Sequence, residues 1–250
     1  MNNPKVSIIT ICFNAENTIS DTIQSVINQT YQNIEYIIVD GASKDQTLNI
    51  INSFSSPMIK IISEPDKGLY DALNKGFKIA SGDIVAALHA DDLYASNQVI
   101  ADVVELFLTH QTDAVSTSVH IFKNDDFQKP YRKYSANKFK TWQLRMGIQP
   151  PHPGFFISKQ ALLKVGYFDI KYKISGDFDW LLRAIKVHRL RIFYSPYVSV
   201  WMRDGGISSS GWKSKVLMNQ EDLDALKKNG FYSNLPYIYL KYLIKIFQMF

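Results

Sequence analysis

The segment VSIITICFNAENT, residues 6–18, decides the fold class of this 250-residue chain. Almost every position of residues 6–12 is apolar or β-branched, which predicts a strand that is buried on both faces, as in a parallel sheet. The run stops at polar residues, and residues 17–28 then carry apolar side chains at helical spacing. The segment therefore predicts a buried strand that is followed directly by an amphipathic helix.

The same alternation of strand and helix continues to about residue 108, and a looser pattern follows it. We therefore expect an α/β fold with a mostly parallel central sheet that is flanked by helices. The further strands are predicted at residues 34–39, 58–62, 83–88, 115–122 and 190–194, and the helices at 17–28, 45–51, 68–80 and 177–187.

Polar side chains follow several of these strands at the points where they end. The carboxyl ends of parallel strands meet at one edge of a sheet, and α/β sheets bind their ligands there. Carboxylates gathered at this edge repel one another, and a divalent ion bound together with a phosphate relieves that repulsion. The residues concerned are Asn14, Glu16, Asp40, Glu64, Asp66, Asp91 and Asp92.

The composition excludes several classes of protein. With 46% hydrophobic and 20% charged residues and a formal net charge of +5, the chain is not a disordered tail, a collagen-like repeat or a disulfide scaffold. Cys12 is the single cysteine and cannot form an intramolecular disulfide, which favours the reducing cytoplasm. No run reaches the roughly 18 apolar residues of a membrane-spanning helix. Neither GxGxxG nor a P-loop motif occurs, so a dinucleotide-binding fold has little support.

Five segments follow one another between residue 6 and about residue 210: SIITICFNAENT, YIIVDGASKDQT, SEPDKGLYDALNKG, GDIVAALHADD and ISGDFDWLLR. Together they resemble the inverting glycosyltransferases of family 2, which have the GT-A nucleotide-sugar fold. The resemblance is greatest to the bacterial enzymes that build capsule, exopolysaccharide or O-antigen chains. It implies a metal-dependent hexosyltransferase that moves a sugar from a nucleotide-diphosphate donor, with a UDP-sugar favoured, to a saccharide or lipid-linked saccharide acceptor. It implies no nucleic acid partner.

The resemblance also divides the chain. Residues 1–112 form the donor-binding half, residues 113–212 form the acceptor-binding and catalytic-base half of the same domain, and residues 213–250 form a helical extension. Two other functions stay open. One is a non-catalytic nucleotide-sugar-binding or scaffold protein, and the other is a sugar nucleotidyltransferase, which would need a phosphate loop rich in glycine and lysine.

The resemblance assigns a set of residues to the donor. Phe13 and Asn14 line the nucleoside, and Asp40 accepts a hydrogen bond from the pyrimidine ring, although Asp40 is also typical of a tight turn. Lys75 contacts the diphosphate or forms a helical pair with Asp71. The whole donor-binding set is Phe13, Asn14, Glu16, Asp40, Asp66, Lys67, Gly68, Asp71, Lys75, Asp92 and Arg203.

The metal motif departs from the family pattern, because His89-Ala90-Asp91-Asp92 stands where family members often have Asp-x-Asp-Asp. Asp91 matches the position that binds the divalent ion, and His89 is a further candidate ligand. Imidazole suits Mn²⁺ better than Mg²⁺, so we expect manganese to be favoured. The alternative is that Asp91 and Asp92 cap a helix.

The segment SGDFDWLLR matches the acidic motif that carries the catalytic base, with Gly176 in place of the first acid. Asp177 matches the base. Asp179 is the alternative, and two residues on a helix separate the side chains by about 200°, so only one can face the substrate. His152 and Trp180 are the candidate acceptor contacts, and both residue types are also common as purely structural side chains.

Residues 236–250 predict a helix with Lys241, Lys245 and Gln248 on one stripe. Such a helix fits an anionic bilayer surface, and the basic stretch at residues 123–145 would add attraction. A peripheral position at the cytoplasmic face of the inner membrane follows. The alternative is a helix that packs on its own domain.

Overall fold

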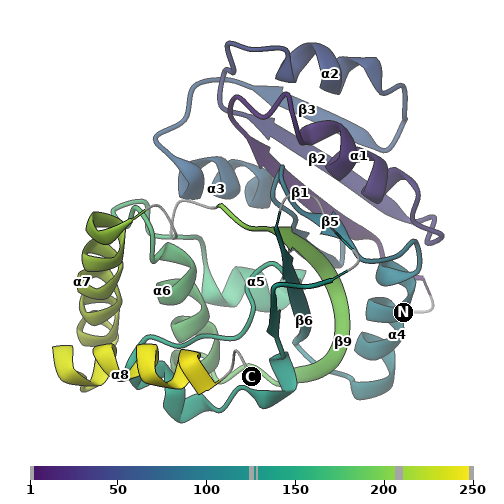
Figure 1. Cartoon of the computed structure of the whole chain (residues 1–250). Helices are drawn as coiled ribbons and strands as arrows, with labels where there is room; N and C mark the ends of the chain where they lie inside the picture. The colour runs from purple at the N-terminus through teal and green to yellow at the C-terminus, as the bar shows by residue number, and fades with distance from the viewer. Residues whose placement is uncertain (1–2, 124–126, 128, 206–210, 248–250) are drawn as a thin grey trace.

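The computed structural model describes residues 3–123, 127, 129–205 and 211–247, and its side chains to Tyr242. In this part of the chain, nine strands form one mixed sheet in the order β3-β2-β1-β4-β8-β6-β9-β5, with β7 beside β6 (Figure 1). The strands are β1 (Val6–Cys12), β2 (Ile34–Asp40), β3 (Ile59–Ser63), β4 (Ile84–Ala87), β5 (Leu93–Tyr94), β6 (Ala114–Phe122), β7 (Arg132–Tyr134), β8 (Phe155–Ser158) and β9 (Ile192–Arg203).

Helices cover both faces of the sheet. They are α1 (Ile19–Ile27), α2 (Thr47–Ser53), α3 (Leu69–Ile79), α4 (Val99–His110), α5 (Lys159–Val165), α6 (Gly176–Leu182), α7 (Trp212–Lys228) and α8 (Leu235–Phe247), with the 3-10 turns η1 (Ala136–Lys138) and η2 (Thr141–Met146) and the π-turn η3 (Arg183–Val187). The sequence prediction of an α/β fold is confirmed.

The buried strand at the N-terminus joins two apolar cores. Ile9 and Ile11 belong to the core under α3, α5 and α6, whereas Ile8 and Cys12 belong to the core under α1, α2 and α4. Successive side chains of a strand point to opposite faces, so a strand covered on both sides is apolar throughout. β1 pairs in parallel with β2 and β4 and leaves its carboxyl end at the centre of the sheet edge.

The sheet is less parallel than the sequence predicts. β8 runs antiparallel to both β4 and β6, while β6 and β9 are parallel. β9 is also much longer than the strand expected at residues 190–194, and its second half, residues 198–203, continues the pairing with β6 beyond two register shifts. Ser199 Oγ contacts Thr117 Oγ1 at 2.5 Å, and Ser195 accepts a hydrogen bond from Ser118. The buried polar side chains of β6 and β9 interrupt the apolar pattern by which a buried strand is predicted from sequence.

The C-terminal helices pack on the domain. α7 lies against α6, and α8 crosses α7 and η2 (Figure 1). Lys241 of α8 is 1% exposed, and its Nζ lies 2.7 Å from Asp222 Oδ2 of α7. The prediction of an exposed polar stripe is therefore wrong at Lys241, while the side chain of Lys245 and all of Gln248 lie outside the described residues. Within the described ranges, no helix is long and apolar enough to cross a bilayer.

Candidate active site

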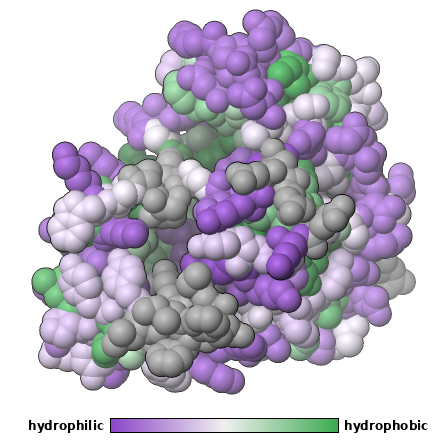
Figure 2. Space-filling view, viewed as in Figure 1, coloured by the Kyte–Doolittle hydropathy of each residue, from purple (hydrophilic) through white to green (hydrophobic). Residues whose placement is uncertain are grey.

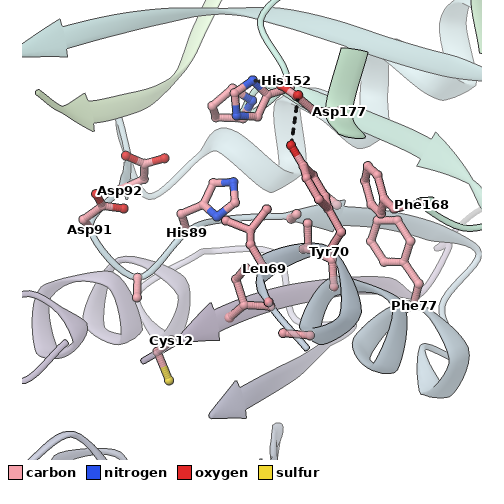
Figure 3. A pocket seen from close by; sticks show the side chains of 18 of the residues that line it. Cys12, Leu69, Tyr70, Phe77, His89, Asp91, Asp92, His152, Phe168 and Asp177 are labelled. Carbon is pink, nitrogen blue, oxygen red and sulfur yellow. Dashed lines mark hydrogen bonds and ion pairs between the residues drawn. The ribbon is translucent and has the colours of Figure 1, made fainter. Parts of the chain in front are cut away.

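A pocket of about 630 Å³ opens at the carboxyl ends of β1 and β4, between α3 and α6. On the face of the molecule that Figure 2 shows, the surface is largely hydrophilic, and hydrophobic residues are visible in a hollow beneath the upper part of the molecule. Asp91 and Asp92 lie on one side of the pocket, His152 and Asp177 on the other, and His89 between them (Figure 3). Residues from both halves of the chain thus meet in one site.

Ten of the predicted site residues line this pocket and seven do not. Those that line it are Phe13, Asn14, Asp66, Gly68, His89, Asp91, Asp92, His152, Asp177 and Trp180. Those that lie outside its lining are Glu16, Asp40, Lys67, Asp71, Lys75, Asp179 and Arg203.

The loop after β1 is tied to the loop after β2. Asn14 has a left-handed backbone, with φ of 51°, and its Oδ1 accepts a hydrogen bond from the backbone N–H of Lys44 at 2.8 Å. Glu16 accepts one from the backbone N–H of Gln46 at 2.8 Å. Phe13, 62% exposed, is left projecting at the mouth of the pocket. Glu16 therefore fixes the loop from outside the pocket.

Asp40 is fully buried at the end of β2 and organises two turns. Its carboxylate accepts hydrogen bonds from Ser43 Oγ at 2.5 Å and from Ser63 Oγ at 2.7 Å. The next residue is Gly41, where a Cβ atom would lie 2.5 Å from an oxygen of Asp66. The turn-forming role of Asp40 is thus observed, and its contact with a nucleoside stays a prediction.

The segment that starts α3 differs from expectation at Lys75. Its Nζ lies 2.8 Å from Glu64 Oε1 and donates to the Pro65 carbonyl at 2.8 Å, so the predicted pair with Asp71 is wrong. Asp71 instead accepts a hydrogen bond from the backbone N–H of Lys67 at 3.0 Å. These residues shape the loop at Asp66 and Gly68 without lining the pocket.

The acidic pair after β4 does not cap a helix, because β5 follows it directly and α4 begins at Val99. Asp92 is 2% exposed, and its Oδ1 has no hydrogen-bond partner among the described residues. Burial, and then the charge of Asp91, raise the pKa of the Asp92 carboxyl well above its usual range. Burial, and then the neighbouring ring of His152, lower the pKa of His89 to about 4, so the imidazole is neutral at pH 7.

The donor set fits a cation that is shared with a ligand. Among the residues that the structure describes, no group of three or more His, Cys, Asp or Glu side chains could hold a metal. Asp91 and the unpartnered oxygen of Asp92 supply carboxylates at one edge of the pocket. Mg²⁺ and similar ions are commonly held by one or two carboxylates together with substrate phosphates. The site therefore suits an ion that arrives with a diphosphate.

Asp177, in the first turn of α6, is the most elaborately held carboxylate of the pocket. Its Oδ2 accepts a hydrogen bond from Gln149 Nε2 at 2.5 Å and lies 3.1 Å from His152 Nδ1. The hydroxyl of Tyr70 lies 3.2 Å from Oδ1 (Figure 3). The same hydroxyl lies 2.5 Å from the carbonyl oxygen of Ile174. Tyr70 and Gln149 were not expected from the sequence, because neither residue type nor spacing connects them with a base more than 25 positions away.

Three other expectations need correction. Asp179 is fully buried away from the pocket, and its carboxylate contacts Arg183 Nε at 3.0 Å and Lys228 Nζ at 3.2 Å, so its position does not suit an alternative base. Trp180 is 4% exposed and donates its Nε1–H to the Gly166 carbonyl, so it cannot stack on an acceptor sugar. Arg203 donates to the Asp91 carbonyl at 3.1 Å and pairs with Asp21 at 2.7 Å, which fixes the loop of the acidic pair.

Comparison with known proteins matches this chain to glycosyltransferases. Residues 7–170 match the family model described as Glycosyl transferase family 2. An uncharacterized glycosyltransferase of Mycobacterium tuberculosis is 32% identical over 186 residues, which cover 74% of this chain and 70% of that protein.

Solved structures share the fold. TarS 1–349 of S. aureus in complex with UDP-GlcNAc has a TM-score of 0.67 at 20% identity, over 88% of this chain and 67% of that one. A mannosyltransferase of Pyrobaculum calidifontis in complex with GDP-Man and Mn²⁺ has a TM-score of 0.68 at 19% identity, over 94% of this chain and 67% of that one. At these identities the similarity shows a GT-A-like fold.

Proposed function

This chain belongs to glycosyl transferase family 2, and on that premise we propose that it transfers a sugar, with inversion, from a nucleotide-diphosphate donor to a hydroxyl of a saccharide acceptor. The observation that carries the proposal is the placement of Asp177 across the pocket from the pair Asp91 and Asp92 (Figure 3). An inverting transfer needs a base on one side of the sugar and a stabilised leaving group on the other. The two sets of carboxylates supply these two sides.

Asp177 is the proposed base. The acceptor oxygen forms a bond to the anomeric carbon, the bond from that carbon to the diphosphate oxygen breaks with its electron pair, and the acceptor proton passes to Asp177. Oδ2 of Asp177 already accepts from Gln149 and lies beside His152. The Tyr70 hydroxyl has a closer acceptor in the Ile174 carbonyl at 2.5 Å. Oδ1 is therefore the oxygen that receives the proton.

The leaving diphosphate lies on the side of Asp91 and Asp92 in this proposal. A divalent ion held by Asp91, with Asp92 and His89 beside it, would neutralise the charge that develops on the diphosphate. Manganese is favoured because the neutral imidazole of His89 suits it better than Mg²⁺. The mannosyltransferase of similar fold binds GDP-Man and Mn²⁺, which supports the choice of ion.

We favour a UDP-sugar as donor. Asp40 has a carboxylate that suits the imide N–H of uracil. The carboxylate is fully buried and accepts hydrogen bonds from the Ser43 backbone N–H and from the hydroxyls of Ser43 and Ser63, so a hydrogen bond to uracil would need the turn at Ser43 to move aside. The TarS structure of similar fold contains UDP-GlcNAc.

One experiment tests donor, metal and inversion together. It measures turnover of a panel of UDP-, GDP- and dTDP-sugars with and without Mn²⁺, and NMR gives the anomeric configuration of the product. A protein that binds these donors without releasing nucleotide would instead be a non-catalytic binding protein.

The acceptor in this proposal is a lipid-linked saccharide of cell-envelope polysaccharide synthesis, reached at a membrane surface. With Lys241 buried, the support comes from the outer face of α8, where large side chains are exposed. They are Leu235, Tyr237, Tyr239 and Leu240, each 40–47% exposed. Tyrosine is well suited to the interface of a bilayer, where one end of the ring meets apolar chains and the other meets water. Flotation with anionic vesicles, compared between the wild type and Tyr237→Ser/Tyr239→Ser, tests this contact.

A further inference from the structure

A carboxylate of α7 binds the segment that leads into the catalytic helix. Glu221 is 9% exposed, and its two oxygens accept hydrogen bonds from three consecutive backbone N–H groups. Oε1 accepts from Lys173 at 2.9 Å, and Oε2 accepts from Ile174 and Ser175, each at 2.9 Å. Hydrogen bonds to an ionised acceptor are about twice as strong as neutral ones. Glu221 therefore holds residues 173–175 firmly, and Asp177 is only two positions further on.

The same segment is held from its other side by Tyr70. The Tyr70 hydroxyl contacts the Ile174 carbonyl oxygen at 2.5 Å, and Glu221 accepts from the Ser175 N–H of the same peptide unit, so α3 and α7 hold this peptide from opposite sides. Ser175 adds a second link to α7, since its Oγ donates to the Met218 carbonyl at 3.3 Å. The backbone before Asp177 thus has few ways to move.

α7 is itself fixed by α8 and contacts the segment that carries Gln149. Asp222, the neighbour of Glu221, forms the buried ion pair with Lys241. Gly147 has φ of 68°, and a Cβ atom there would lie 2.5 Å from an oxygen of Asp222. Residues 173–175, which lead to Asp177, and Gly147, which lies two positions before Gln149, are therefore both packed against the turn of α7 that carries Glu221 and Asp222.

We propose that Glu221, on α7, is a positioning residue for Asp177. The inference rests on the proposed function, in which Asp177 takes the acceptor proton. A reacting group displaced by about 1 Å can lose about 10²-fold in rate. Loss of the Glu221 carboxylate acts through that displacement, and it leaves the donor-binding residues at the ends of β1 and β4 unchanged.

Glu221→Gln is the first test, because it keeps the side-chain volume and turns one acceptor oxygen into an N–H donor that faces backbone N–H groups. We expect kcat to fall by about 10- to 100-fold, with donor affinity measured by calorimetry changed less than about twofold. The matched control is Asp224→Asn, on the same helix. Asp224 is 55% exposed, and its carboxylate lies 2.9 Å from Lys171 Nζ and accepts a hydrogen bond from the Tyr172 hydroxyl at 2.8 Å. Its kcat should stay within about twofold of the wild type.

A double-mutant cycle with Asp177→Asn separates positioning from general stabilisation. A residue that acts through Asp177 has little left to lose once that carboxylate is gone, so Glu221→Gln should change kcat less than about twofold in the Asp177→Asn background. Equal losses in both backgrounds would overturn the inference, as would unchanged kcat in a folded Glu221→Gln protein. If Glu221→Gln does not fold, Glu221→Asp carries the same cycle with the charge kept. Full activity of Asp177→Asn alone would instead refute the proposed function.

Discussion

Tyr70 occupies the space that a side chain at Gly176 would need. A Cβ atom at position 176 would lie 2.7 Å from the Tyr70 ring, whose hydroxyl is 3.2 Å from Asp177 Oδ1. The missing acid of the family motif is therefore matched by a tyrosine from a different helix. The departure from the family motif at Gly176 therefore has a steric explanation.

Gly176→Ala should accordingly lower turnover although alanine favours helices. The new methyl group must displace the Tyr70 ring, because the contact is shorter than real Cβ atoms show. We expect kcat to fall by about tenfold or more, in line with the sensitivity of reacting groups to small shifts. Steady-state kinetics with a saturating donor measure the effect. The control is made in the Tyr70→Ala background, where the ring is absent and Gly176→Ala should cause no further loss of kcat relative to Tyr70→Ala alone. Unchanged kcat in Gly176→Ala itself would contradict the explanation.

The parts of the fold that the sequence predicts are those with local signals. β1 can be predicted because five of its seven residues are apolar, and all seven are buried. The burial of Lys241 cannot be predicted in this way. A helical pattern treats a lysine as solvent-facing, and it carries no sign of the ion pair with Asp222, which lies 19 positions earlier in the chain. Glu221 is hidden for a related reason, since it binds backbone N–H groups, which carry no residue signature.

The same contrast between local sequence signals and long-range contacts applies to the candidate site. Asp91 and Asp177 lie in motifs of contiguous residues, and the structure brings both into the pocket. Tyr70 and Gln149 reach Asp177 across 107 and 28 positions, through packing that no spacing rule describes. Trp180 is a candidate acceptor contact in the sequence because an aromatic ring can stack on a sugar, but its indole N–H donates to the Gly166 carbonyl within the core.

Metal removal should abolish transfer. EDTA is expected to reduce turnover to background, and Mn²⁺ to restore it further than Mg²⁺.

Asp91→Ala should weaken binding of the nucleotide diphosphate in the presence of Mn²⁺ while the circular dichroism spectrum is unchanged. His89→Asp supplies the carboxylate of the common motif and should lower the ratio of the Mn²⁺ rate to the Mg²⁺ rate. Full activity in EDTA would exclude the ion, and an unchanged ratio would place His89 away from it.

Acid stability should depend on Glu35 of β2. Burial raises the pKa of this carboxyl, but hydrogen bonds from Lys60, Ser7 and Ser81 outweigh it and lower the pKa to about 2. An acid whose pKa is lowered on folding stabilises the protein above its unfolded pKa, and the gain is lost as the pH falls from about 4.5 toward 2. Over that interval the wild type should lose about 3 kcal/mol more unfolding free energy than Glu35→Gln. Urea denaturation at a series of pH values measures both, and parallel curves would contradict the assignment.

The ion pair between Lys241 and Asp222 should matter for stability. Lys241→Met leaves the buried Asp222 carboxylate without its cation, and breaking such a pair costs about 3–5 kcal/mol. Urea denaturation should show this loss. Tyr239→Ser, on the exposed face of the same helix, should cost less than about 1 kcal/mol and serves as the control. If Lys241→Met is as stable as the wild type, α8 does not depend on this contact.

The sharpest test of the site compares Asp177→Asn with Asp179→Asn, two isosteric changes in one helix. Asp177 lines the pocket with an oxygen available for a proton, and general-base catalysis contributes about 10² to 10⁴ in rate. Asp177→Asn should therefore cut kcat by that order and leave donor affinity nearly unchanged. Asp179 is fully buried between Arg183 and Lys228, so Asp179→Asn should lower the melting temperature instead, with kcat of the folded protein within about tenfold of the wild type. Turnover, nucleotide affinity and thermal unfolding of both variants decide between them. A nearly active Asp177→Asn beside an inactive but folded Asp179→Asn would transfer the role to Asp179, and two active variants would remove α6 from the mechanism.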